Sequence, residues 1–303
     1  MRYILLIVGM LLAGIAPAFA SIQQNVHDPS YKIALGAEMP GVRVDWPRQA
    51  IFIITEVKAP TLAMGRRAYQ AALKIALDAA RKQVNEGIIG LKLTSYATVK
   101  DAVAAFVLPE DSLYEIGKPV RPVADTWDTG DKILRLLSVL PLVGSYSPGA
   151  LAARMLKIEQ QTFAGDAVAP IRAKETIMLR PREEVAQISN GPYTGLIVDC
   201  SGLRFTPALL TKFVAEDGAE FWGTAGVNRL LVMEKGMFGV SADLKSALNA
   251  DRVGATPLII RPLGIAGVLR GDLVFSADAA KLITDQDAIS HFLAPLSIVL
   301  VID

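Results

Sequence analysis

The chain has 303 residues, which is enough for one large domain or two small ones with a substantial core. Its 31 basic and 30 acidic residues give a net charge of +1, which excludes a protein that binds nucleic acid through bulk attraction. Hydrophobic residues make up 52% and charged residues 20%, a composition that argues against long intrinsic disorder. One cysteine and two histidines exclude a disulfide framework and a Cys/His-rich metal site.

The first twenty residues have the pattern of a cleavable signal peptide. Arg2 gives a positive start, residues 4–15 are almost unbroken apolar, and 18–20 form the small-x-small pattern that signal peptidase cuts. We predict cleavage after Ala20 and a periplasmic or secreted protein. The alternative is a retained anchor, but the apolar run is short for a span of about 20 residues. Because no cysteine adjoins the cut, we expect no direct lipid anchor.

The N-terminal α+β module is predicted to span 46–180, after an extended lead-in at 21–45. Residues 50–57 are rich in β-branched and aromatic side chains and predict a strand. Residues 62–86 predict a helix, because apolar residues, most of them alanines, recur at spacings of three and four. Gly87 is expected to end that helix. The alanine stripe predicts close packing against a sheet.

The remainder of this module has weaker patterns. Residues 88–99 alternate between apolar and polar side chains and predict a strand, whereas 109–130 contain three prolines and predict a loop. Residues 133–143 fit a strand or a helix, and a turn at Pro141 and Gly144 favours the strand. A helix, a strand and a polar linker are expected at 150–161, 173–179 and 181–191.

The C-terminal module, 191–303, begins with an apolar strand that ends in Cys200, so we expect a packed, inert thiol. Residues 213–222 predict a hairpin, because Asp217-Gly218 supplies the positive φ that a tight turn needs. Ser276 is expected to cap a helix. A further helix and three strands are predicted at 241–250, 258–260, 272–275 and 297–302.

Several short motifs imitate catalytic or metal sites without meeting their spacing. Asp128-Thr129-Gly130 matches the aspartic protease tripeptide, but a single copy in a polar stretch predicts an ordinary turn. Asp125, Asp128 and Asp131 lack the alternate spacing of a calcium loop. Residues 144–149 resemble the G-x-S-x-G motif of a serine hydrolase only loosely, because the residue two positions before Ser147 is Ser145 and not glycine.

The remaining candidates also favour structural interpretations. His27 lies in the lead-in, and His291 follows a helix, where a surface or capping role is expected. Arg66 and Arg67 fit the solvated edge of an amphipathic helix. There is no phosphate-binding glycine loop. We therefore predict no catalytic, cofactor-binding or metal-binding residues, no cofactor, and a protein that is not an enzyme.

Two groups of residues together resemble a known superfamily. The first is the alanine-rich stretch 65–79, followed by 90–95. The second group is longer and comprises 193–203, 207–209, Asp217-Gly218, Gly223, Arg252-Val253, 257–260 and 272–279. In this order they resemble Gram-negative envelope proteins that include small membrane-associated lipoproteins and ring or disk proteins around the flagellar motor. The chain departs from them at Thr211, where proline is expected, and in lacking an acylated N-terminal cysteine.

The resemblance implies an α+β fold of two sheet-plus-helix modules, each with mixed or antiparallel strands packed on helices. It also implies a non-enzymatic, periplasmic structural or assembly protein of the cell envelope, with a flagellar basal-body ring or disk as the first candidate. The expected partners are further copies of the chain or envelope and flagellar proteins, and not nucleic acid. The alternative is a periplasmic binding or adaptor module for lipid or an envelope polymer.

Overall fold

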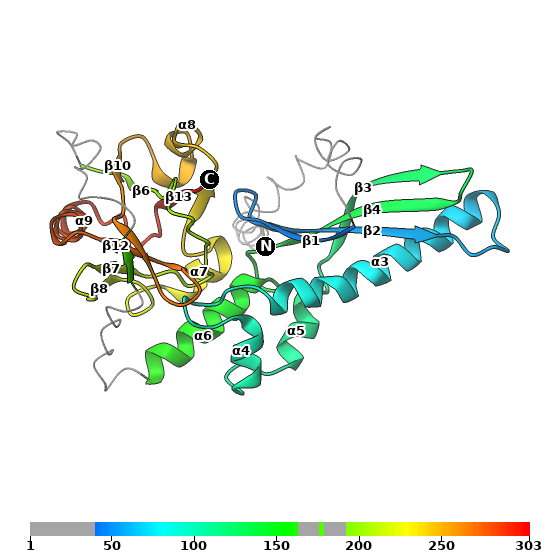
Figure 1. Ribbon diagram of the computed structural model, residues 1–303, viewed down its shortest axis with the longest axis horizontal. Coiled ribbons are helices and arrows are strands. Elements are labelled where there is room, and N and C mark those ends of the chain that lie inside the picture. Colours follow the sequence, from blue (N-terminus) through cyan, green and yellow to red (C-terminus); the bar gives the residue numbers. More distant parts are fainter. Residues whose placement is uncertain (1–39, 163–175, 179–191) are drawn as a thin grey trace, which may run out of the picture. The chain divides into compact units, whose positions relative to one another are not determined.

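The computed structural model describes residues 40–162, 176–178 and 192–303 and has the predicted α+β class (Figure 1). The chain forms two compact units. The first contains Phe52–Val84, Val120–Leu140 and the described residues up to Arg43; the second contains the remaining described residues. The predicted signal peptide, most of the lead-in and the linker at 181–191 lie outside the described residues.

The first unit is built on a four-stranded sheet with the order β1-β2-β4-β3. Its strands are β1 (Gly41–Asp45), β2 (Ala50–Lys58), β3 (Arg121–Asp128) and β4 (Ile133–Pro141). The strands predicted at 50–57 and 133–143 are thus confirmed. β3 and β4 form an antiparallel hairpin with a bulge between Pro122 and Ala124.

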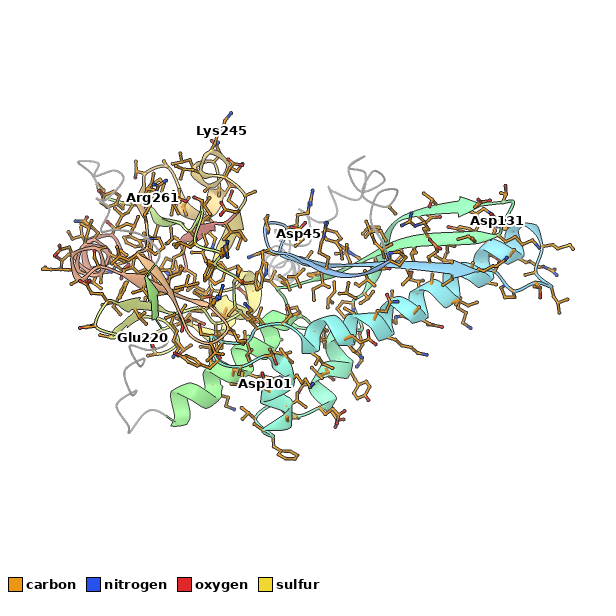
Figure 2. All side chains as sticks on the ribbon, viewed as in Figure 1. Asp45, Asp101, Asp131, Glu220, Lys245 and Arg261 are labelled. Carbon is orange, nitrogen blue, oxygen red and sulfur yellow. The ribbon has the colours of Figure 1, made fainter. Side chains whose placement is uncertain are left out.

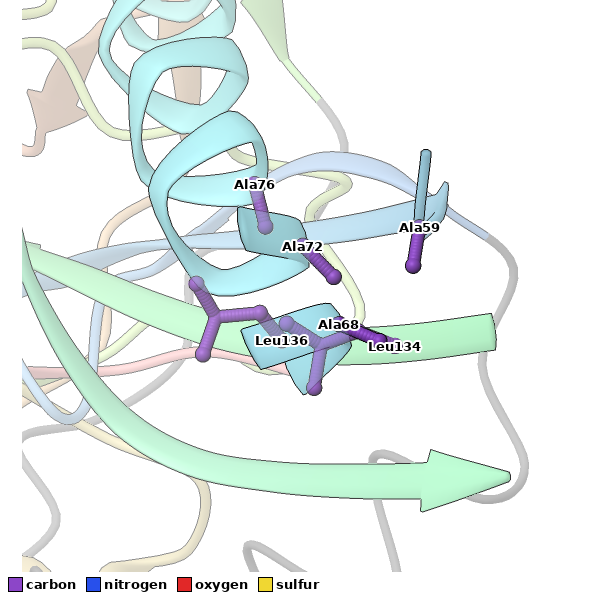
Figure 3. Packing of buried hydrophobic residues seen from close by; sticks show 6 residues of the cluster. All are labelled: Ala59, Ala68, Ala72, Ala76, Leu134 and Leu136. Carbon is purple, nitrogen blue, oxygen red and sulfur yellow. The ribbon is translucent and has the colours of Figure 1, made fainter. Parts of the chain in front are cut away.

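The long helix α3 (Gly65–Ile89) packs on this sheet through alanines. Ala68, Ala72 and Ala76 recur every four residues, so they share one face of the helix. They form a buried cluster with Leu134 and Leu136 of β4 (Figure 3). Side chains this small allow the helix backbone to approach the sheet closely, as the sequence predicted.

Both ends of α3 differ from the predicted 62–86. The helix begins only at Gly65, because the preceding residues form a turn in which the Ala63 N–H donates to the Pro60 carbonyl, at 3.0 Å. It also continues through Gly87 to Ile89. A helical glycine costs about 1 kcal/mol, and the complete burial of Ile88 offsets that cost.

The strand predicted at 88–99 is wrong, although its alternation is real. Leu91, Leu93 and Ser95 are buried, but they lie in a compact turn with a single bridge between Lys92 and Thr98. Thr98 then caps α4 (Val99–Ala104) in a capping box with Asp101. The capping box starts a helix at Val99, and this prevents the alternating stretch from continuing as a strand.

The loop predicted at 109–130 is also wrong. This stretch contains α5 (Asp111–Ile116) and the edge strand β3. Its prolines stand where these elements tolerate them, since Pro109 precedes α5 and Pro122 lies in an edge strand next to a bulge.

The second unit contains a four-stranded sheet with the order β10-β6-β13-β9. Its strands are β6 (Gly195–Asp199), β9 (Gly239–Ser241), β10 (Pro257–Ile260) and β13 (Ile298–Val301). All three pairings in this sheet are parallel; the mixed strands expected for the module are those of the second sheet, described below. The apolar strands are buried on both faces, as parallel sheets require.

One face of the parallel sheet is covered by α8 (Leu244–Leu248) and the 3-10 turn η3 (Asp251–Val253). The turn packs so tightly that a Cβ at Gly195 would lie 2.6 Å from Val253 Cα. The predicted helix 241–250 is shorter than expected, because β9 occupies Ser241.

A second, mixed sheet has the order β5-β11-β12-β7-β8. Its strands are β5 (Thr176–Met178), β7 (Phe213–Ala215), β8 (Glu220–Trp222), β11 (Gly264–Ala266) and β12 (Asp272–Phe275). The predicted hairpin is confirmed, with Gly218 at a φ of +89°. Phe213 lies in an aromatic cluster, with ring centroids 4.4 Å from Trp222 and 5.1 Å from Phe275.

Three helices complete the second unit: α6 (Pro148–Thr162), α7 (Arg229–Lys235) and α9 (Ala277–Ser290). The predicted cap of α9 is confirmed, since the Ser276 hydroxyl accepts a hydrogen bond from the Ala279 N–H at 3.1 Å. α7 was not predicted. Its carboxyl end is held by the half-buried Arg252, whose guanidinium donates to the carbonyls of Lys235 and Gly236.

Candidate functional site

The carboxyl ends of the parallel strands form the first candidate site. In a parallel sheet these ends meet at one edge, and that edge is where open α/β sheets bind ligands. Asp199 is the last residue of β6 and Ser241 the last of β9, while Arg261 follows β10 and Asp303 lies just beyond β13. Four polar side chains therefore come from the four neighbouring strand ends.

The Asp199 carboxylate is fully engaged by its neighbours. Its Oδ2 accepts a hydrogen bond from Arg261 Nε at 2.8 Å, and its Oδ1 accepts from the Ser201 N–H at 3.1 Å and from the Ser201 hydroxyl. The Asp199 side chain is 6% exposed and that of Arg261, labelled in Figure 2, is 43% exposed. Asp303 accepts from the Gly202 N–H, so the same turn is tied to the end of β13.

The pKa of Asp199 lies below its ordinary value. Burial acts to raise this pKa, but hydrogen bonds from Ser201 and then the ion pair with Arg261 outweigh it. A carboxylate with this many donors remains ionised and holds its neighbours in place. The ion pair joins the ends of β6 and β10, so its role is to stabilise the strand ends, and we call it the lock at the strand ends.

A second cluster surrounds Asp272 at the start of β12. This side chain is almost inaccessible, and its Oδ1 accepts from the Lys212 N–H at 2.8 Å. Lys212 Nζ also pairs with Glu220 Oε2 at 3.0 Å. Burial raises the pKa of Asp272 to about 6, against the lowering effects of the Lys212 N–H and charge.

The turn that follows α3 docks beside this cluster through its backbone. The N–H groups of Leu209 and Leu210 donate to the carbonyls of Lys92 and Leu93, both at 2.9 Å. Lys92 Nζ donates to the Leu269 carbonyl at 2.6 Å, and burial lowers the Lys92 pKa. Residues 91–98 are therefore an integral part of the second unit.

The motifs that imitate catalytic sites have structural roles. Asp128 Oδ1 accepts from the N–H groups of Gly130 and Asp131, so the protease-like tripeptide is the turn of the β3–β4 hairpin. Ser147 is buried, donates to the Gly144 carbonyl at 2.6 Å and accepts from the Gly149 N–H, so its hydroxyl holds the turn at 144–149 together. His27 lies outside the described residues.

The other two singled-out residues also match their predicted interpretations. His291 caps the carboxyl end of α9 with φ +53°, and its N–H donates to the Asp287 carbonyl at 2.7 Å. Cys200 is buried and forms no disulfide, and its thiol donates to the Val198 carbonyl at 3.7 Å, which fits the predicted packed strand end.

Within residues 40–162, 176–178 and 192–303, His, Cys, Asp and Glu side chains do not gather in threes as a metal ion would require. Among the helices in the same ranges, none combines the length and apolar content needed to cross a bilayer.

Comparison with known proteins gives a match for one part of the chain. Residues 195–303 match the family model for the second domain of Tp0624 from Treponema pallidum. The search of curated proteins gives no significant match. The matched range carries both Asp199, at the carboxyl ends of the parallel strands, and Asp272.

Sequence reasoning missed the two polar clusters. A signal was present, because Asp199 and Arg261 each stand at the end of an apolar run. The runs were predicted as strands, but without their parallel pairing nothing places these two charges beside each other. Lys212 and Asp272 are likewise adjacent only because β7 and β12 pair in parallel.

Proposed function

We propose that this protein is a non-enzymatic structural or assembly protein of the cell envelope, exported to the periplasm and cut after Ala20. Its partners would be further copies of itself or other envelope proteins. A flagellar basal-body ring or disk is the first assembly to test.

The observation that carries the proposal is the match of 195–303 to a domain of a Treponema pallidum protein. The same residues carry most of the resemblance to envelope proteins of the flagellar motor. In Tp0624 the domain is the second of its chain. Recurrence of this stretch as one domain among others supports a module that is combined with different neighbours.

The first unit offers a physical means of self-association. β3 is an edge strand of its sheet, and Asp125, Thr126 and Asp128 on it are exposed. An edge strand can pair with a strand of another copy through its backbone. Repeated head-to-tail pairing that closes on itself produces a ring.

The test is the swimming motility of a deletion strain, complemented in trans with the wild-type gene or with a Thr126→Lys variant. Lysine opposes pairing at an edge strand more strongly than the short Asp125 and Asp128 that β3 already carries, because its long side chain extends over the strand edge. Thr129→Lys in the neighbouring turn is the matched control, since Thr129 is also exposed but lies outside the strand. We expect lost swimming, restored by the wild type and the control and not by Thr126→Lys.

Normal swimming of the deletion strain would contradict the flagellar role. The wider envelope role has a separate test, which is cell fractionation with N-terminal sequencing of the recovered protein. A chain that begins at Ser21 in the periplasmic fraction is expected. An uncut chain in the cytoplasm would contradict it.

A further inference from the structure

The loop between β2 and α3 exposes two large apolar side chains. Leu62 is 96% exposed and Met64 76% exposed. Exposed apolar side chains are common in loops that form no hydrogen bonds to the rest of the protein. This loop is instead fixed by hydrogen bonds, so the exposure belongs to a defined conformation.

Three hydrogen bonds fix the loop conformation. The Ala59 N–H donates to the Lys132 carbonyl at 2.8 Å, Lys132 Nζ donates to the Ala63 carbonyl at 3.2 Å, and the Ala63 N–H donates to Pro60. Ala59 is also buried in the alanine cluster of Figure 3. The chain therefore buries Ala59, half-buries Ala63 and leaves the two large apolar side chains in solvent.

The exposed side chains lie among positive charges. Lys58, Arg66 and Arg67 are exposed on either side of the loop, and Lys132 lies in the adjoining β3–β4 turn. The acidic residues of that turn are Asp128 and Asp131, the latter labelled in Figure 2, so four basic and two acidic side chains leave a net charge of +2.

The two arginines stand in an unfavourable place for their own helix. Arg66 and Arg67 lie in the first turn of α3, where the helix dipole is positive, and that turn contains no acidic residue. Within the described residues, neither guanidinium forms an ion pair or hydrogen bond. A negatively charged surface outside the chain would complement both the dipole and the side chains.

We propose that this loop surface, formed by Leu62, Met64, Arg66 and Arg67, docks on the anionic face of a phospholipid bilayer. Two projecting apolar side chains are far too few for a protein interface of about 800 Å² per partner. They suit shallow insertion at the boundary between headgroups and acyl chains, with neighbouring cations held near lipid phosphates. This inference goes beyond the proposed envelope role and does not depend on it.

The test is flotation of the processed protein with lipid vesicles. Vesicles of phosphatidylcholine mixed with phosphatidylglycerol are compared with pure phosphatidylcholine, at low and high salt. We expect binding to the anionic vesicles that weakens with salt. Leu62→Ser with Met64→Ser should reduce the partition coefficient at least about tenfold, and Arg66→Glu with Arg67→Glu should abolish the preference for anionic lipid.

The matched control replaces two exposed large residues of the second unit, Phe106→Ser with Tyr114→Ser. Phe106 is 95% exposed and Tyr114 65% exposed, and in the sequence both stand close to the acidic residues Asp101, Glu110 and Asp111. This control should bind vesicles as the wild type does. All variants should keep the wild-type circular dichroism, because every changed side chain is exposed.

Three results would overturn the proposal. They are an absence of wild-type binding, unchanged binding by the loop variants, and equal loss in the control. If the loop variants instead lower the mass of an oligomer in light scattering without altering flotation, the surface binds a second copy. That outcome would reject the bilayer and leave the proposed assembly role intact.

Discussion

The two buried aspartates of the second unit lie in different sheets, and their pKa values are shifted in opposite directions. Asp199, at the carboxyl end of β6, has a lowered pKa, whereas Asp272, at the start of β12, has a pKa raised to about 6. Both are nearly inaccessible, at 4% and 1% exposure. Burial alone therefore does not decide the direction.

The difference lies in the donors that each carboxylate receives. Asp199 has a guanidinium, a hydroxyl and an N–H within reach, and the guanidinium belongs to the partly solvated Arg261. Asp272 has the N–H of Lys212 and the neighbouring Ser95 hydroxyl, both of which lower its pKa, but it has no guanidinium, and the ammonium of Lys212 is engaged with Glu220. A buried carboxylate keeps a low pKa only when a charged donor or several donors replace the water molecules that it loses on burial.

The largest effect is expected from Asp272→Asn, which removes a charge that the fold disfavours. The folded pKa of about 6 lies above the ordinary 3.8, so wild-type stability falls as the pH rises between these values. Each pKa unit corresponds to about 1.4 kcal/mol, so ionisation of Asp272 lowers the free energy of unfolding by about 3 kcal/mol above pH 6. The amide oxygen can still accept the Lys212 N–H.

Urea unfolding at pH 4 and pH 8 measures this effect. Asp272→Asn should be more stable than the wild type by up to about 3 kcal/mol at pH 8 and by little at pH 4. Asp131→Asn, at an exposed turn position, is the matched control and should change neither value. An equal gain at both pH values would show that packing and not charge is responsible.

The opposite result is expected from Asp199→Asn, which should lower stability at pH 7 by about 1–2 kcal/mol. The asparagine cannot form an ion pair with Arg261, although Arg261 stays partly solvated and so limits the loss. Because the folded pKa of Asp199 is lowered, its contribution is present above pH 3.8 and disappears as the pH falls through the folded value.

The same unfolding measurements, extended to acidic pH, check this prediction. The difference between Asp199→Asn and the wild type should shrink toward low pH. Arg261→Gln is the companion variant and should cost less than about 1 kcal/mol, since ion pairs with exposed partners contribute little. A full wild-type stability of Asp199→Asn at pH 7 would mean that the lock at the strand ends does not stabilise the fold.

The local elements around these aspartates were largely predictable from the sequence. The apolar runs at 195–200 and 297–302, the Asp217-Gly218 hairpin and the Ser276 cap all have short-range signals. The clusters themselves depend on pairings between strands some 60 residues apart in sequence, such as β6 with β10. Periodicity contains no information about such partners.

The failures between 88 and 130 have a different physical origin. Leu91, Leu93 and Ser95 alternate with polar residues because every second side chain in this stretch is buried. A turn that packs against the rest of the unit gives the same pattern as a strand. The Thr98–Asp101 capping box was a readable signal for α4 that competed with the alternation. Prolines at 109 and 122 obscured a short helix and an edge strand that tolerate them.

The smallest effect is expected from Lys212→Met, which alters the charge around Asp272 without altering its hydrogen bond. The backbone N–H of residue 212 still donates to Asp272, but the ammonium that partly offsets the Glu220 charge is gone. Since Lys212 lowers and Glu220 raises the Asp272 pKa, this pKa should rise by a further fraction of a unit.

Carbon-13 NMR titration of the Asp272 carboxyl measures this shift directly. Glu220→Gln is the reciprocal variant, and it should move the pKa of Asp272 downward, because the raising charge is then removed while the lysine remains. Shifts of the same sign in both variants would mean that the ion pair acts through local packing. Opposite shifts would show that the charges of Lys212 and Glu220 both act on the Asp272 carboxyl, in addition to the larger effect of its burial.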